Sequence, residues 1–219
     1  MARRAFATFT AAVVLACGSI TGCGAGNING PVTVAAGQKT GDVTTVNGPV
    51  TVENDATVGS ATTVNGPVSL GSNVTAQSVK TVNGAVKIGD AARVSGSVLT
   101  VNGSVDLGNN ADVSGKVQNV NGAISLFAAR VGGGITTVNG DIEVGSGSKV
   151  EGGIHVERPS FSTDNARRPS RIVIGPSATV NGGMRFDQPV KLYISESAQV
   201  SGSIEGATPE KFSGDRPPG

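Results

Sequence analysis

The chain has 219 residues, of which 33 are glycine and 3% are aromatic, with no tryptophan. Its core must therefore be a thin layer of small branched side chains, which excludes one thick globular core and favours an elongated domain. The 17 Lys and Arg nearly balance the 16 Asp and Glu, so we expect neither nucleic acid nor an acidic membrane surface as a partner.

The N-terminal segment has the pattern of an export signal. Two arginines precede an apolar stretch over 5–16, which is too short to span a membrane. The segment Ile20–Cys23 then resembles the bacterial lipobox, in which the cysteine is lipidated and becomes the mature N-terminus. We therefore predict a signal peptide over 1–22, a membrane anchor at Cys23 and a short linker over 23–26.

Two alternatives to this anchor remain open. Cys17 could be the lipidated residue, although the apolar region before it would be short, or the segment could be an ordinary secretory signal with an incidental cysteine. Cleavage before Cys23 leaves a single thiol at the position that lipidation requires, which favours Cys23. The protein would then be exported and held in the cell envelope. Gly24 is not the aspartate that retains lipoproteins in the inner membrane, so the outer membrane is favoured if there is one.

The tripeptide Val-Asn-Gly recurs six times at a nearly constant spacing, after a degenerate copy at Ile28–Gly30. A period near twenty is typical of solenoids, whose stacked units cannot bury their apolar faces alone. We expect the chain to turn at each Asn-Gly because glycine accepts positive φ. The asparagines are Asn47, Asn65, Asn83, Asn102, Asn121 and Asn139.

Apolar-polar-apolar triplets such as Val50–Val52 and Val105–Leu107 follow the tripeptides. This alternation is the signature of a strand with one buried face, so Val105 should point inward and Asp106 outward. We predict an all-β, single-stranded β-helix (β-solenoid) over 27–206, with rungs of about 18–19 residues.

A second landmark in the rungs is a valine two residues before a glycine. It occurs at Val94, Val113, Val131, Val150, Val180 and Val200. The period breaks once, because the interval from Val150 to Val180 is more than one and a half times as long as a rung. We predict a loop inserted at 157–171 and a flexible C-terminal tail over 207–219.

Candidate sites are few. The stacked asparagines could line a ligand groove, but a structural hydrogen-bonded ladder explains their regularity without further assumptions. His155 is the single histidine and is expected to be a surface residue. The loop arginines could bind an anion, although a solvated loop is the simpler interpretation. They are Arg158, Arg167, Arg168 and Arg171.

The sequence gives no indication of catalysis. No His or Cys cluster has metal-ligand spacing, so we expect no metal and no cofactor. Hexapeptide acyltransferases need a strict period of six, and β-helical polysaccharide lyases need clustered charges on one wall. Neither pattern is present, and we expect that the protein is not an enzyme.

The rung pattern of Val94–Val98 followed by Val101–Gly108 resembles that of bactofilins, as do Arg171–Gly175, Ala178–Gly182 and Leu192–Gly202. This resemblance implies a right-handed, triangular β-helix that assembles end to end into filaments without nucleotide. It favours a membrane-anchored, self-associating structural protein. The alternative is a surface module that binds or adheres to envelope polysaccharide or protein.

The ends of a solenoid expose unpaired backbone groups unless a cap covers them. At the C-terminal end, Pro189, Tyr193, Phe212 and the last residues could form a cover, whereas the N-terminal end offers only Gly24–Gly26. We therefore expect self-association through the terminal rungs.

Overall fold

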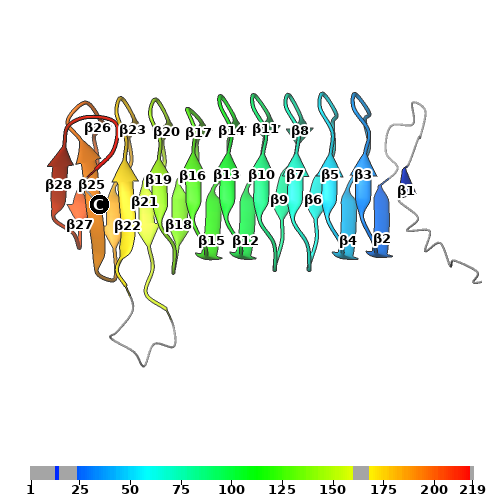
Figure 1. Cartoon of the computed structure of the whole chain (residues 1–219), viewed down its shortest axis with the longest axis horizontal. Helices are drawn as coiled ribbons and strands as arrows, with labels where there is room; N and C mark the ends of the chain where they lie inside the picture. The colour runs from blue at the N-terminus through cyan, green and yellow to red at the C-terminus, as the bar shows by residue number, and fades with distance from the viewer. Residues whose placement is uncertain (1–12, 15–23, 160–167, 218–219) are drawn as a thin grey trace, which may run out of the picture.

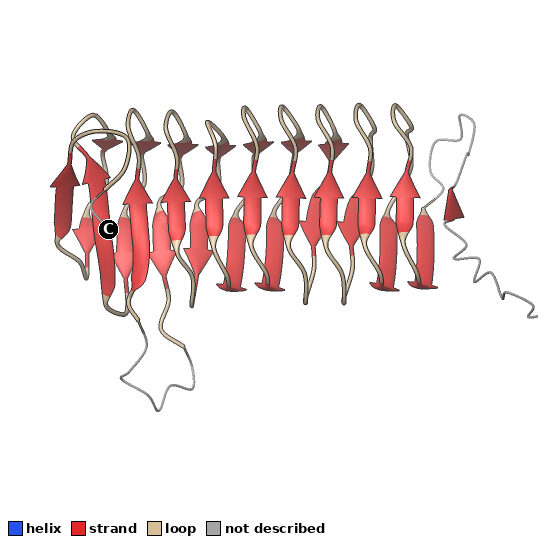
Figure 2. Cartoon of the chain, viewed as in Figure 1, coloured by secondary structure: helices blue, strands red, loops and turns tan. Residues whose placement is uncertain are grey.

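The computed structural model describes residues 13–14, 24–159 and 168–217, which form a parallel β-solenoid (Figures 1 and 2). Three parallel sheets run along its length and form its three walls, with eleven strands in sheet A, ten in sheet B and seven in sheet C. Across these residues the chain forms no helix that could cross a membrane. The predicted all-β solenoid with a triangular cross-section is confirmed.

The strands of each sheet follow one another at one per rung. Sheet A contains β1 (Val13–Val14), β3 (Val32–Val34), β5 (Val50–Val52), β7 (Val68–Leu70), β10 (Val86–Ile88), β13 (Val105–Leu107), β16 (Ile124–Leu126), β19 (Ile142–Val144), β22 (Ser170–Ile174), β25 (Val190–Ser195) and β28 (Pro209–Phe212). Sheet B contains β2 (Ala25–Asn29), β4 (Val43–Asn47), β6 (Ser60–Thr62), β9 (Ser78–Lys80), β12 (Val98–Asn102), β15 (Val117–Asn121), β18 (Ile135–Thr137), β21 (Ile154–Val156), β24 (Met184–Phe186) and β27 (Ile204–Glu205). Sheet C contains β8 (Thr75–Ala76), β11 (Arg93–Val94), β14 (Asp112–Val113), β17 (Arg130–Val131), β20 (Lys149–Val150), β23 (Thr179–Val180) and β26 (Gln199–Val200).

The core is a stack of identical positions. Val86, Val105 and Ile124 pair in register on three successive rungs, and all three are fully buried. Asp106 lies on the outer face between two buried residues, as the alternation predicted. Each aliphatic side chain therefore packs on its counterpart in the next rung, and the core extends along the whole solenoid without interruption.

The Asn-Gly corner joins sheet B to sheet A, and four of its seven glycines have the expected positive φ, with values of 131–159°. Gly66 and Gly84 do not have positive φ. A Cβ on Gly66 would overlap the carbonyl oxygen of Gly48, one rung earlier. Close stacking of the corners therefore excludes a side chain even where φ is not positive.

The turn from sheet A to sheet C also has a left-handed position. Gly37 and Gly147 adopt φ 68° there, whereas other rungs place residues with side chains at the same position. Those residues are Asp55, Asn73, Ala91, Asn110, Ala128 and Ser177, with φ between 46° and 61°. Because the residue type varies from rung to rung, the sequence pattern did not reveal this turn.

The inserted loop leaves the solenoid between β21 and β22, at the corner where the preceding rungs carry Asn-Gly (Figure 1). Because β22 begins at Ser170, the last two residues of the predicted 157–171 loop belong to a strand. Residues 160–167 lie outside the part of the chain that the structure describes.

The predicted tail over 207–219 is wrong for Pro209–Phe212, which form β28 and pair in parallel with β25. Phe212 is buried with Val173 and Tyr193 on the outer face of sheet A, and this contact stabilises the last strand. The chain then folds back across that face in Figure 1. Tyr193 and Phe212 therefore cover a side of the solenoid and not its end.

Candidate functional site

The six asparagines form one hydrogen-bonded ladder with Asn29. In every step the side-chain Nδ2 donates to Oδ1 of the preceding asparagine at 2.8–3.0 Å. Each amide from Asn47 to Asn121 thus uses one N–H and one lone pair within the ladder. Its second N–H and second lone pair remain available to groups outside it.

A second ladder of hydrogen bonds, which the sequence did not predict, lies just inside the same corner. Thr45 and Thr63 are buried, and each hydroxyl donates to the carbonyl oxygen of a glycine 15 residues earlier at 3.0–3.1 Å. Thr81 and Thr100 repeat this contact. The available signal was the threonine two residues before the asparagine in five of the six repeats.

The threonine ladder is interrupted at Asn119. Its Nδ2 donates both to Gly103 O at 3.0 Å and to Gly122 O at 2.8 Å. Gly122 O is the acceptor that Thr137 would otherwise use, and the buried Thr137 hydroxyl has no partner. The corner therefore contains a series of threonines whose hydroxyls are hydrogen-bonded and one rung in which the threonine hydroxyl is not.

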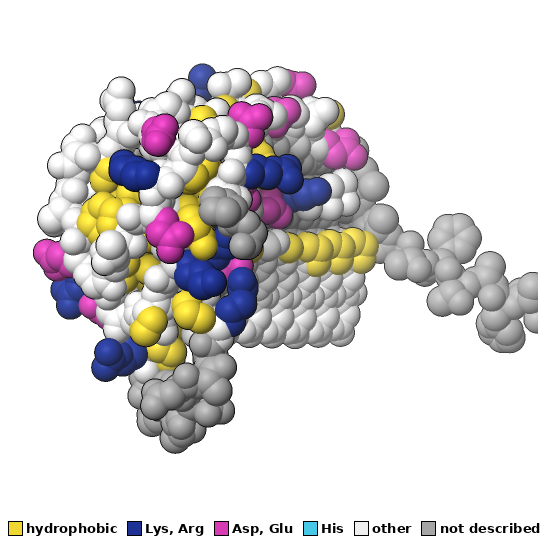
Figure 3. Space-filling model, turned by 60° about the vertical axis from the view of Figure 1, so that its left-hand side comes forward, with side chains coloured by type: hydrophobic (Ala, Val, Ile, Leu, Met, Phe, Trp, Pro, Cys, Tyr) yellow, Lys and Arg dark blue, Asp and Glu magenta, His cyan; other side chains and the backbone are white. Residues whose placement is uncertain are grey.

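Outside the corner, sheet B carries a row of apolar side chains exposed to solvent. Ile28 is 71% exposed, and the valines of the first tripeptides are 37–40% exposed. The row consists of the exposed Ile28, Val46, Val64 and Val82 and continues through the partly exposed Val101, Val120 and Val138. We call this row together with the adjoining asparagine ladder the Val–Asn face. Figure 3 shows a long uncharged strip on the lower flank of the solenoid, where the Asn-Gly corner lies.

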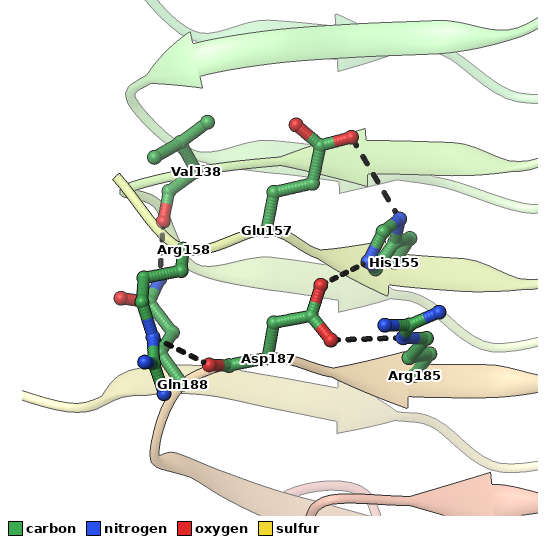
Figure 4. Close-up of polar contacts among 7 residues, drawn as sticks. All are labelled: Val138, His155, Glu157, Arg158, Arg185, Asp187 and Gln188. Carbon is green, nitrogen blue, oxygen red and sulfur yellow. Dashed lines mark hydrogen bonds and ion pairs between the residues drawn. The ribbon is translucent and has the colours of Figure 1, made fainter. Parts of the chain in front are cut away.

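The last rungs of sheet B are ionic. His155 Nε2 lies 2.8 Å from Asp187 Oδ2, and its Nδ1 lies 3.7 Å from Glu157 Oε1 (Figure 4). Arg185 Nε donates to the other Asp187 oxygen at 2.8 Å. The hydrogen bonds from His155 and Arg185 lower the pKa of Asp187. His155 thus belongs to an exposed patch of alternating charge on one wall.

The three loop arginines that the structure describes contact different groups. Arg158 Nε donates to the backbone oxygen of Asp187 at 3.1 Å, next to the ionic patch. Arg168 contacts Asp141 at 2.6 Å, while the guanidinium of Arg171 lies 5.2 Å from the Tyr193 ring centre. Arg167 lies outside the described residues.

A groove runs over the outer face of sheet A, with a volume of about 710 Å³. Ser69, Lys87 and Asp106 line its floor, and the half-exposed Phe127 lies at one end. Phe127 takes a backbone position that is glycine in neighbouring rungs. The Phe127 N–H donates to Leu107 O, just as the Gly108 N–H donates to Ile88 O one rung earlier. A hydrophobic ring beside hydroxyl, ammonium and carboxylate groups suits a sugar chain.

The described residues contain no group of three or more His, Cys, Asp or Glu that could hold a metal ion. The proposed anchor, Cys23, lies outside them. Comparison of the chain with protein-family models, curated proteins and solved structures returns no match.

Proposed function

We propose that this protein is a non-catalytic, membrane-anchored structural β-solenoid of the bacterial cell envelope that self-associates end to end, in the manner of the bactofilins that its rungs resemble. The observation that carries the proposal is the open stack. In the described residues, β2 and β27 end sheet B and β28 ends sheet A, each paired on one side only. Such edges template further strands.

The N-terminal end supports this role best. The Val32 N–H donates inward to Pro49 O at 2.9 Å, so the Thr33 N–H points toward the open end. Val14 of β1 pairs with Thr33 there, and β1 lies within the predicted signal peptide. Cleavage before Cys23 would remove β1 and leave β3 as a free edge beside β2.

The C-terminal end has two features that oppose edge pairing. Pro209 has no N–H to donate, and Lys211 takes the position on β28 that pairs with the buried Ile194. Prolines and inward lysines are devices by which natural sheets protect their edges. We therefore assign the stronger self-association to the N-terminal rung.

Sedimentation velocity tests this assignment. All residues of the hydrophobic core lie between positions 25 and 212, so the chain lacking residues 1–23 keeps the complete core. At tens of micromolar it should form end-to-end assemblies that sediment faster than a monomer, and Thr33→Pro should remove these assemblies because the open edge loses an N–H. A clean monomer of the unaltered sequence over that range would contradict end-to-end assembly.

The anchor is tested separately by cell fractionation of a Cys23→Ser variant. Each buried CH₂ of an acyl chain contributes ~0.8 kcal/mol, so several chains hold a protein stably. The variant should leave the membrane fraction. If it stays there, lipidation at Cys23 is not what holds the protein.

The groove on sheet A favours a second candidate function, a surface module that binds envelope polysaccharide. Phe127 would stack on a sugar face while Lys87 and Asp106 bind its hydroxyl groups. Binding of neutral oligosaccharides can be followed by NMR. Phe127→Ala should abolish it, whereas Leu99→Ala, which removes an exposed apolar side chain from sheet B, should leave it unchanged.

A further inference from the structure

We propose that two copies of this protein also pack side by side through the Val–Asn face, in parallel orientation. This interface uses a wall of the solenoid and not its ends, so it goes beyond the end-to-end association proposed above. Neither contact requires the other.

The first observation is that the face is apolar, regular and uncharged. Over seven rungs its outer row holds only valine and one isoleucine, and the adjoining row holds only asparagine. The next row of sheet B, on the side of the valine row away from the asparagines, carries a single charge. It consists of Thr44, Thr62, Lys80, Leu99, Gln118 and Thr136. Exposed apolar residues scattered singly are ordinary, but a contiguous patch marks an interaction site.

The second observation is the period of the face, which selects its partner. Rungs stack about 4.8 Å apart, so the valine row is roughly 30 Å long. A partner whose repeat differed by roughly 0.4 Å would be out of register by half a rung after six steps. A second copy has the same period and can interdigitate along the whole row, as identical side chains do between paired sheets in steric zippers.

The size of the face sets the strength of pairing. Three rows across seven rungs cover about 30 Å by about 15–20 Å. Two copies would therefore bury on the order of 1,000 Å², near the lower limit for specific association. The interface should be weak and concentration-dependent in solution, and stronger where copies are concentrated on one surface.

Lys80 decides the orientation. Its rung is that of Val82, the fourth of the seven valine-row positions. An antiparallel pair centred on this rung would bring the two Lys80 ammonium groups together in an otherwise uncharged interface. A parallel pair, related by a two-fold axis along the solenoid, places each Lys80 opposite the partner's asparagine ladder instead. There the ammonium can donate to a side-chain oxygen such as that of Asn83.

Disulfide trapping tests both the face and the orientation. The chain lacking residues 1–23 contains no cysteine, so Val64→Cys introduces a single thiol on the third rung of the face. In the parallel pair this thiol meets its own counterpart, and oxidation should give a covalent dimer several-fold above the Thr75→Cys control on sheet C. A disulfide needs Cβ atoms about 3.5–4.5 Å apart, so trapping reports register as well as contact.

The alternatives give different results. If Val64→Cys forms no more dimer than Thr75→Cys, the face does not pair. If it links to Val101→Cys in a mixture but not to itself, the orientation is antiparallel and the proposal is overturned. The Thr33→Pro variant should still trap normally, because it alters the end and not the wall.

An equilibrium measurement completes the test. Val64→Asp should weaken side-by-side dimers by at least ~tenfold, because the interface would bury an unpaired carboxylate. Thr75→Asp, at an exposed position on sheet C, should leave them unchanged, and circular dichroism of both variants should match that of the unaltered sequence. The proposal is overturned if the unaltered chain forms no dimer through this face but binds cell-wall polysaccharide, and if Val64→Asp loses that binding. The face would then be a ligand-binding face.

Discussion

Two isosteric substitutions in the buried threonine ladder test the energetics of the corner. Thr100 and Thr137 are both fully buried in sheet B. The Thr100 hydroxyl donates to Gly84 O at 3.2 Å, whereas that of Thr137 has no partner. Replacing either residue by valine removes a hydroxyl and leaves nearly the same volume, so the two variants differ in hydrogen bonding and not in packing.

The expected effects have opposite signs. Thr100→Val removes a hydrogen bond and leaves a buried carbonyl oxygen without this donor, which costs about 1–3 kcal/mol. Thr137→Val removes a hydroxyl whose unpaired burial itself costs about 1–3 kcal/mol, so this variant should be neutral or more stable. The difference between the two free energies of unfolding should therefore be at least about 1 kcal/mol.

Urea unfolding of the chain lacking residues 1–23 measures this difference. The unfolding midpoint should fall for Thr100→Val and stay the same or rise for Thr137→Val, with equal slopes for both. If both variants lose the same stability, the hydrogen bond at Thr100 contributes nothing and the corner is stabilised by packing alone.

Three further predictions concern individual positions. Val105→Asp should unfold several rungs, because it buries an unpaired carboxylate, while Asp106→Lys should stay within about ±0.5 kcal/mol; thermal melting compares the two. Ala91→Gly should raise the free energy of unfolding by about 1 kcal/mol, since Ala91 has φ 56°; a decrease in urea unfolding would contradict this strain. The hydrogen bonds from His155 and Arg185 lower the pKa of Asp187 from 3.8. Its contribution to the free energy of unfolding is therefore present above pH 3.8 and is lost as the pH falls through the lower pKa of the folded state. Asp187→Asn should remove this part of the acid dependence of the melting temperature.

The periodic parts of the fold could be predicted because one rule acts at every rung. Burial on one face forces alternation, as at Val105 and Asp106, and stacking forces a constant rung length. The turn from sheet A to sheet C could not be predicted, because aspartate, asparagine, alanine and serine all take its left-handed position. There the stacked backbone on either side imposes the conformation, and the local residue does not.

The features near the candidate sites depend on contacts that a repeat pattern does not encode. Phe127 replaces one glycine in a column of glycines, and only the stacked structure places it at the end of a groove. Pro209 and Lys211 disfavour strand formation, so β28 could not be expected from its composition. Phe212 holds that strand through a contact with Tyr193, which lies a full rung earlier in the sequence.

The position where the asparagine ladder ends also sets the limit of the proposed side-by-side interface. Asn139 is its last member, and in the next two rungs Glu157 and Asp187 replace the outward valine. The loop leaves at this corner, and Gln188 donates to Val138 O in place of a stacked Asn-Gly. A charged row cannot extend an uncharged interface, so side-by-side pairing must end here. Under the proposed anchoring at Cys23, the uncharged rungs lie next to the membrane, where copies are concentrated, and the ionic rungs remain in solvent at the far end.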